Sequence, residues 1–368
     1  MKLSKAISWL KGTLQHCLFP DLEECWKTFL TEKEKQLVSI LELLRVEEFV
    51  VRKADNQWLG RKLRDRESIA RSFVAKAVYG YPFTRSLIEA LNTTPNLRRI
   101  CGFVRVSDIP DESTFSRAFK EFAESRLGER VHEATVERCL KPELVGHVNR
   151  DATAIKGREK PVKKPPKEKP APKKRGRPAG GEYREPKEQT RLERQRDQSA
   201  EEALRELPVV CDRGTKKNSK GFKETWVGYK LHADVNDCGL PVSVALTGAS
   251  VHDSQVAIPL MKMSSARVDY LYDLMDAAYD AETIREVSRS LGHVPIIDKN
   301  SRGKQTIPMA PHEAVRYNER TAAERFNSRI KEEFGAGNVM VRGAQKVMMH
   351  LMFGVVALFA DQLLKLAT

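Results

Sequence analysis

Residues 156–178, near the middle of the chain, constrain its fold more than any other stretch. They read KGREKPVKKPPKEKPAPKKRGRP and contain eleven lysines and arginines, six prolines and only two glutamates. A segment with this charge and so few apolar side chains cannot join a hydrophobic core, so we expect it to be extended or disordered. Its expected role is an electrostatic contact with phosphate groups. A solubilising linker is the alternative interpretation.

The end of this basic segment carries a more specific pattern. Arg175 and Arg177 flank a glycine, which resembles a hook whose arginines enter the narrow minor groove of A·T-rich DNA. The whole chain has 64 lysines and arginines against 50 aspartates and glutamates, a formal net charge of +14. An excess of this size predicts a polyanionic partner, most simply nucleic acid.

Several classes of protein are disfavoured by composition. Six cysteines without a C-x-x-C pair argue against a disulfide scaffold and a structural zinc site, and they indicate a reducing, intracellular environment. The first residues contain no uninterrupted apolar stretch and no small-residue cleavage site, so we expect no signal peptide. The longest apolar run, Val347 to Ala360, is too short to span a bilayer and contains His350. We therefore expect a buried helix there, a cytoplasmic protein and no membrane partner.

The first 140 residues or so predict helices. Thr31 and Glu34 form a capping-box pattern, and apolar residues follow at helical spacing. Further helices are expected at Ser68–Val78 and Thr84–Leu91, and another has one face marked by Phe115, Phe119 and Phe122. Short helices with a basic face are typical of a helix-turn-helix DNA-binding unit, and equally of a plain helical bundle with charged solvated faces. The sequence does not separate these two interpretations.

After the basic segment the pattern changes to mixed strand and helix. Residues 225–235 alternate apolar and polar, residues 236–239 predict a turn, and residues 240–248 predict the partner strand of an antiparallel hairpin. The remaining expected strands are 145–155, 268–275 and 293–297, and the expected helices are 189–207, 252–261, 281–291 and 311–334. This order predicts a mixed α/β domain at residues 141–368, with a basic proline-rich insertion at about 156–220. An all-α domain at residues 1–140 would precede it and bind DNA ends, mediate dimerisation, or both.

One segment of the last expected helix brings four reactive side chains together. On an ideal helix at about 100° per residue, Tyr317, Arg320 and Lys331 fall within a stripe about 60° wide that includes Glu324. A carboxylate flanked by a phenol and two cations could bind a metal and phosphate groups. A solvated helix with an Arg–Glu pair four residues apart is the plainer interpretation of the same spacing.

A metal site requires further carboxylates, and the expected strands offer two. Asp151 lies within an otherwise core-like strand, where an ionised carboxylate is costly unless it is paired or metal-bound. Asp276 follows an apolar strand and opens a turn of small residues, and strand ends are where ligands gather in open α/β sheets. We expect Asp276 rather than Asp273 to be the second acid. Asp253 and Asp280 are each expected to be the N-cap of a helix.

These residues resemble the motifs of a known family. Asp151-Ala-Thr resembles a D-[GAS]-[ST] motif, and Asp276-Ala-Ala-Tyr-Asp280 resembles the turn after the family's second aspartate, with Ala278 in place of the usual glycine. Tyr317, Arg320, Glu324 and Lys331 match a Y-x2-R-x3-E-x6-K signature at every position. Over roughly residues 108–365 the chain therefore resembles a DDE transposase of a bacterial insertion sequence, of the insertion-sequence-four type.

The resemblance implies an RNase H-like catalytic domain in which Asp151, Asp276 and Glu324 hold two divalent metal ions. Mg²⁺ is the expected cofactor, with Mn²⁺ as a substitute, because carboxylate oxygens suit hard cations. The implied reaction is strand cleavage at the element's ends followed by transfer of a 3′-hydroxyl into target DNA. Tyr317, Arg320 and Lys331 would contact the DNA end. The implied partners are the terminal inverted repeats, target DNA and a second copy of the chain in a synaptic complex.

Two other functions are compatible with the same motifs. One is a catalytically silent, sequence-specific DNA-binding protein that keeps the fold. The other is an RNase H-like nuclease that hydrolyses DNA without strand transfer. Three acids in the family's order argue against the silent protein, whereas the sequence does not distinguish the nuclease from a transposase.

Overall fold

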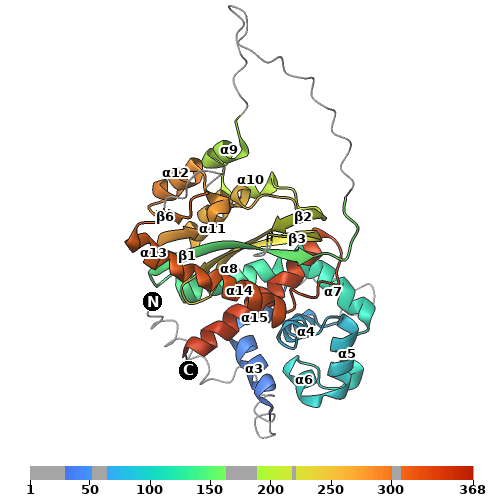
Figure 1. The fold of residues 1–368 in the computed structure, drawn as a ribbon. Helices are drawn as coiled ribbons and strands as arrows, with labels where there is room; N and C mark the ends of the chain where they lie inside the picture. The colour runs from blue at the N-terminus through green and yellow to red at the C-terminus, as the bar shows by residue number, and fades with distance from the viewer. Residues whose placement is uncertain (1–29, 52–63, 163–188, 218–220, 301–307, 368) are drawn as a thin grey trace, which may run out of the picture.

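The structure is a computed structural model that describes residues 30–51, 64–162, 189–217, 221–300 and 308–367. Its centre is a six-stranded mixed sheet with the order β2-β3-β1-β5-β6, in which β4 also pairs with β3 (Figure 1). The strands are β1 (Val145–Lys156), β2 (Asp212–Lys217), β3 (Lys223–Asn236), β4 (Pro241–Gly248), β5 (Tyr270–Met275) and β6 (Val294–Ile297). A mixed sheet flanked by helices is the α/β architecture that the sequence predicts.

The pairing of β1 sets the geometry of the site. β1 runs antiparallel to β3 and parallel to β5, and β5 runs parallel to β6. In this register Arg150 lies opposite Asp234 of β3 and level with Met275 of β5. The next residue along each parallel strand is Asp151 on β1 and Asp276 after β5, so the register brings these two acids level with each other at the C-terminal end of β5.

Helices cover both faces of the sheet (Figure 1). On one face lie α9 (Arg191–Asp197), α10 (Ala200–Arg205), α11 (Ser254–Arg267) and α12 (Glu282–Ser290). On the other lie α8 (Leu127–Leu140), α14 (Thr321–Glu332) and α15 (Ala344–Ala367). Successive β-strand side chains point to opposite faces. Asp151 therefore points toward α14, where it contacts Asn327. Arg150 points toward α11 and contacts Asp234, which also accepts a hydrogen bond from Ser264 of α11.

The N-terminal helices pack around α15. They are α3 (Glu32–Leu44), α4 (Arg66–Val78), α5 (Thr84–Thr93), α6 (Pro95–Ile100) and α7 (Glu112–Glu124). The predicted capping box of Thr31 and Glu34 is confirmed at the start of α3. Phe73 of α4 stacks on Phe353 of α15 at a ring-centroid distance of 5.5 Å, and Phe119 of α7 lies against both rings. One hydrophobic core thus continues from these helices through α15 to the sheet.

α15 is the helix predicted from the apolar run near the C-terminus. It extends beyond that run to 24 residues and, by length and a mean hydropathy of 1.8, it could cross a membrane. The expectation of shortness concerned the apolar run alone, and the helix is longer because the charged and amide residues that flank the run continue it. In the structure 78% of its apolar window is buried against the rest of the protein, as expected of a core helix.

Two expectations about elements are wrong, and one strand was not predicted. The charged helix at 189–207 is two short helices, because Ser199 and Glu202 form a capping box that starts α10. The long helix at 311–334 is α13 (Pro311–Tyr317), a 3₁₀ turn η4 (Asn318–Arg320) and α14. The edge strand β2 was not expected, because its sequence, DRGTKK, lacks alternating apolar residues.

Candidate active site

Asp151 lies on β1 and faces α14. Its side chain is half-buried, and Oδ2 accepts a hydrogen bond of 3.0 Å from Nδ2 of Asn327. Burial raises the pKa of Asp151 to about 6, although the nearby Arg320 guanidinium opposes the shift. Asp276 and Asp253 raise it further, because negative charges nearby disfavour ionisation. Asp151 is therefore an acid whose negative charge is not balanced by its protein neighbours.

Asp276 stands at the end of β5 and is in the same electrostatic environment. Its Oδ1 accepts a hydrogen bond of 2.9 Å from the backbone N–H of Ala278, which fixes the turn predicted from the small residues. Burial raises the pKa of Asp276 also, the Ala278 N–H and Arg320 oppose this, and Asp253 and Asp298 add to it. The two acids expected on the strands are thus brought together.

Arg320 is the cation that faces both acids. Burial alone would lower its pKa, but the surrounding Asp151, Tyr317, Asp276 and Glu324 raise it. Its Nη1 donates to Oε1 of Glu324 at 3.1 Å, and its Nε lies 3.4 Å from the Tyr317 hydroxyl. Arg320 ends the 3₁₀ turn η4, in which residues three apart eclipse one another, so Tyr317 and Arg320 lie one above the other.

Glu324, the expected third acid, lies apart from the other two. It belongs to the first turn of α14, its side chain is 62% exposed, and its one hydrogen bond given by the structure is to Arg320. The four residues of the expected stripe are therefore not equivalent. Tyr317 and Arg320 face Asp151 and Asp276, whereas Glu324 is connected to those acids through Arg320.

Lys331 marks the other end of the stripe. Burial lowers its pKa, the nearby Lys216 and Lys156 lower it further, and Asp151 opposes them. Lys331 therefore lies between the acid site and a second cationic group at the ends of β1 and β2. Lys331 and Glu324 both belong to α14, so helical spacing still places them on the same side of that helix.

Asp253 is a member of the site that the sequence analysis assigned to a different role. It occupies the N-cap position of α11, but its side chain makes no capping hydrogen bond. Instead its Oδ1 accepts a hydrogen bond of 2.8 Å from Nζ of Lys230 on β3. The expected N-cap position is therefore confirmed, but the side chain is directed to Lys230 and does not cap the helix. A lysine in the middle of an otherwise apolar strand was the available signal, because such a cation requires a nearby acid.

Asp280 and Asp273 have other roles. Ala281, not Asp280, is the N-cap of α12, and Asp280 accepts hydrogen bonds from Arg285 and from the backbone N–H of Asn300. The expected cap is therefore wrong. Asp273 is fully buried and accepts hydrogen bonds from the Tyr270 and Ser288 hydroxyls. It belongs to the interior on the α11 side of the sheet, away from Asp276.

The donor chemistry of Asp151 and Asp276 fits a hard divalent cation. Both are carboxylates whose pKa values are raised by burial, and Asp276 lies close enough to raise the pKa of Asp151 further. As the side chains stand, no group of three His, Cys, Asp or Glu residues within the described ranges is arranged to hold a metal ion. Completing the set with Glu324 would require that side chain to leave Arg320 and turn toward the two aspartates.

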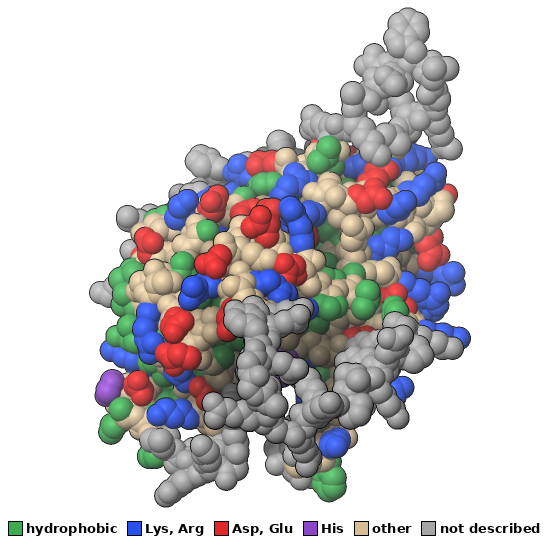
Figure 2. All heavy atoms as spheres, turned by 90° about the horizontal axis from the view of Figure 1, so that it is seen from above, with side chains coloured by type: hydrophobic (Ala, Val, Ile, Leu, Met, Phe, Trp, Pro, Cys, Tyr) green, Lys and Arg blue, Asp and Glu red, His purple; other side chains and the backbone are tan. Residues whose placement is uncertain are grey.

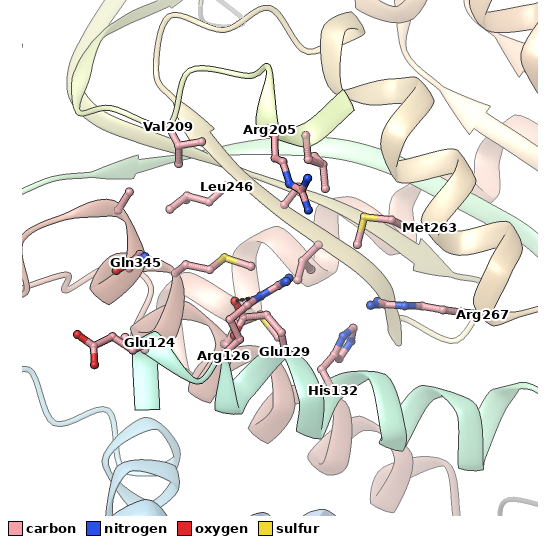
Figure 3. A pocket seen from close by; sticks show the side chains of 17 residues that line it. Glu124, Arg126, Glu129, His132, Arg205, Val209, Leu246, Met263, Arg267 and Gln345 are labelled. Carbon is pink, nitrogen blue, oxygen red and sulfur yellow. Dashed lines mark ion pairs between the residues drawn. The ribbon is translucent and has the colours of Figure 1, made fainter. Parts of the chain in front are cut away.

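A separate cavity does not include the site residues. A cavity of about 500 Å³ lies between α8, α10, α15 and β4, with Met263, Leu246 and Arg267 among its lining residues (Figure 3). None of the expected site residues lines it. Arg175 and Arg177, the expected minor-groove contacts, lie outside the described residues.

Comparison with known proteins gives two matches to protein families. The family described as "Transposase DDE domain" matches residues 151–360, which is more than half of the chain and begins at Asp151. The family described as "Transposase domain (DUF772)" matches residues 24–121, which include the described helices α3 to α6. No curated protein matches the chain. No solved structure matches it either.

Proposed function

Because the chain belongs to the transposase DDE domain family, we propose that it cuts DNA at the ends of an insertion sequence and transfers the freed strand into target DNA. The observation that carries this proposal is the approach of Asp151 and Asp276 beneath Arg320. Two acids with raised pKa values and one cation form a site whose charges do not balance, which is typical of a functional site rather than of a structural ion pair.

The proposed fold and organisation follow the family. We propose an RNase H-like catalytic domain of the insertion-sequence-four type at residues 141–368, with Tyr317, Arg320, Glu324 and Lys331 as its signature. Residues 1–140 form the proposed N-terminal domain, and the second transposase match within them supports a role in the same reaction. A homodimer is the proposed active form, because two DNA ends must be held together for joining.

Asp151, Asp276 and Glu324 are the proposed catalytic carboxylates and the proposed ligands of Mg²⁺, with Mn²⁺ as a substitute. A bound divalent cation would supply Lewis-acid activation of the attacking water or 3′-hydroxyl and neutralise charge at the scissile phosphate. Asn327 holds Asp151 by a hydrogen bond to Oδ2. The Ala278 N–H in the same way orients Asp276 through its Oδ1.

Arg320 and Tyr317 are proposed to position the DNA end. The Arg320 guanidinium can form two parallel hydrogen bonds to a phosphate, and such a phosphate would compete with Glu324 for it. That exchange would free Glu324 to turn toward the aspartates when DNA is bound. The pKa of Tyr317 is raised to about 12 by burial, so its hydroxyl remains protonated and can donate a hydrogen bond to a phosphate oxygen.

A cleavage and joining assay tests the proposal. The substrate is a duplex from the element's own flanking DNA with Mg²⁺ or Mn²⁺, and wild type is compared with Glu324→Gln. The matched control is Glu332→Gln, which makes the same charge change on an exposed position of the same helix. We expect wild type and Glu332→Gln to cut and join, and Glu324→Gln to bind DNA without cutting.

Other results of this assay would favour one of the two alternative functions. Cutting without joining by wild type would indicate a nuclease. Equal binding by all three proteins with no cleavage under either metal would indicate a silent DNA-binding protein. Equal cleavage by Glu324→Gln and wild type would remove Glu324 from the catalytic set.

A further inference from the structure

A second group of cations lies away from the acid site, in a cavity of about 400 Å³ between α4, α7 and α15. Four cationic side chains line it, namely Lys76, Arg158, Arg342 and Lys346. Glu112 is the acid among the lining residues, and it forms an ion pair with Arg85 at 3.5 Å. On the face over α11 and α12, by contrast, cationic and anionic side chains are intermixed (Figure 2). The cavity therefore concentrates positive charge.

Lys76 of α4 is the buried member of this group. Its side chain lines the cavity and the residue is 8% exposed, yet the structure gives its ammonium no hydrogen bond or ion pair with the described residues. Burial lowers its pKa to about 8, and no carboxylate opposes the shift. A buried cation without a counter-charge is strongly destabilising, so this position favours an anion.

The neighbouring groups leave the charge of Lys76 uncompensated. His350 lines the same cavity and hydrogen-bonds the backbone carbonyl of Gly335. Burial and Lys76 together lower the pKa of His350 to about 4, so this ring is neutral and supplies no charge of either sign at neutral pH. Phe73 and Phe119 form an apolar wall beside it. An incoming anion would therefore meet Lys76 on the floor and three cations nearer the surface.

The cavity is connected to the acid site by further cations. Lys331 lies between Asp151 and the pair formed by Lys156 and Lys216. Lys156 ends β1, and Arg158 of the cavity follows two residues later. From Asp151 to Lys156 the strand rises about 17 Å, which corresponds to about five base pairs of duplex. A duplex with a phosphate at Asp151 can thus follow these cations toward the cavity.

We propose that this cavity binds a backbone phosphate of the DNA, with Lys76 at its floor and Arg158, Arg342 and Lys346 around it. This inference rests on the proposed function, because it takes DNA as the ligand. It adds a contact made jointly by the N-terminal helices and the sheet domain, at a distance from the reacting phosphate. The contact is with the backbone, so it positions the duplex and reads no sequence.

Binding of the full-length chain to an end duplex, measured over a range of salt concentrations, tests this site. The variants are Lys76→Met, which keeps the length of the side chain and removes its charge, and Lys346→Ala at the half-buried edge of the cavity. The control is Lys120→Ala, an exposed lysine of α7 that pairs with Glu124 at 3.6 Å. Thermal melting of each variant verifies that it is folded.

We expect Lys76→Met to lower DNA affinity about tenfold, as for loss of one charge-assisted hydrogen bond. We also expect the slope of log affinity against log salt to fall in magnitude by about 0.9 for one lost phosphate contact. Lys346→Ala should act in the same direction, and Lys120→Ala should match wild type. If Lys76→Met and Lys346→Ala both match Lys120→Ala in affinity and slope, the phosphate site is wrong even though wild type binds and cuts DNA.

Titration with inorganic phosphate separates the two possible sources of the anion. If phosphate binds wild type but not Lys76→Met, while the DNA affinities and slopes are equal, the cavity is a free-anion site and the DNA assignment fails. If wild type binds no duplex of any sequence, the proposed function fails, and this assignment fails with it. A lower slope confined to the two cavity variants supports the site independently of whether the chain cuts.

Discussion

Arg150 and Asp151 are neighbours on β1, and their surroundings could hardly differ more. Arg150 points to the α11 side, where it is fully buried and donates to both carboxylate oxygens of Asp234 at 2.8 and 2.6 Å. An oxygen of Asp273 lies 3.5 Å from Nη2 of Arg150. A serine hydroxyl donates to Asp234, and a serine and a tyrosine hydroxyl donate to Asp273. Every charged group of this cluster has partners, although the cluster lies in the interior of the protein.

Asp151 points to the α14 side and has far fewer partners. The Asn327 amide donates a hydrogen bond to it, and the charge of Arg320 lowers its pKa. Two further aspartates stand close enough to raise its pKa. Both residues are charged and Arg150 is fully and Asp151 partly buried, so they differ in how completely their charges are paired. A satisfied buried cluster supports the fold, whereas an unsatisfied and accessible one retains capacity for a ligand. The comparison predicts different consequences of substitution on the two sides of one strand.

The largest expected effect is on the Asp151 side and concerns activity. If Asp151 is a ligand of the proposed catalytic metal ion, Asp151→Asn should reduce cleavage at the element's ends by roughly a thousandfold or more, because it removes that ligand. It should leave the melting temperature equal or higher, since it removes an ionised carboxylate from a partly dry site. Parallel cleavage and melting measurements test this. Normal cleavage by Asp151→Asn would contradict the comparison at its central point.

The next effect is on the Arg150 side and concerns stability. Asp234→Ala leaves Arg150 buried with only Asp273 as its counter-charge, so the free energy of unfolding should fall by about 3–5 kcal/mol. Urea unfolding of the purified variant measures the loss. The double variant Arg150→Met with Asp234→Leu should recover much of it, because no charge is then left unpaired. A single-variant loss below about 1 kcal/mol would mean that the cluster is less important to the fold than its hydrogen bonds indicate.

The sequence predicts the Asp151 side better than the Arg150 side. Asp151 was found because it stands within a strand where the pattern requires an apolar residue. Asp276 was found because it stands where an apolar strand ends. Asp253 was correctly placed at the start of a helix, but its bond to Lys230 was not predicted, because only the register of β3 shows that Lys230 reaches it. Arg150 was not singled out, since an arginine in a strand is ordinarily exposed and its acids are distant in sequence.

The turn η4 shows why the helical stripe could be only partly correct. No glycine or proline lies between Tyr317 and Glu324, so the sequence contains no signal to interrupt the helix there. In the structure three residues form a 3₁₀ turn, which shifts Tyr317 and Arg320 relative to Glu324 and Lys331. The residues that face the acids are thus set by packing of η4 against β1 and β5, which periodicity does not encode.

The smallest expected effect is the response of stability to a divalent cation. If Asp151 and Asp276 hold a metal, Mg²⁺ at about ten times its dissociation constant should raise the melting temperature by a few degrees. Asp151→Asn should lose this shift, because one of the two converging carboxylates is gone. Differential scanning of both proteins with and without Mg²⁺, at equal ionic strength, measures the effect without any DNA.

The Arg150 side provides the control for that measurement. A conservative change there, Ser288→Ala, removes one hydroxyl from Asp273 and should lower the melting temperature while leaving the Mg²⁺ shift intact. Equal shifts in wild type and Asp151→Asn would mean that the cation acts elsewhere, and the open acids would then need another ligand. Loss of the shift in Asp151→Asn but not in Ser288→Ala would assign metal binding to one face of β1 and structural support to the other.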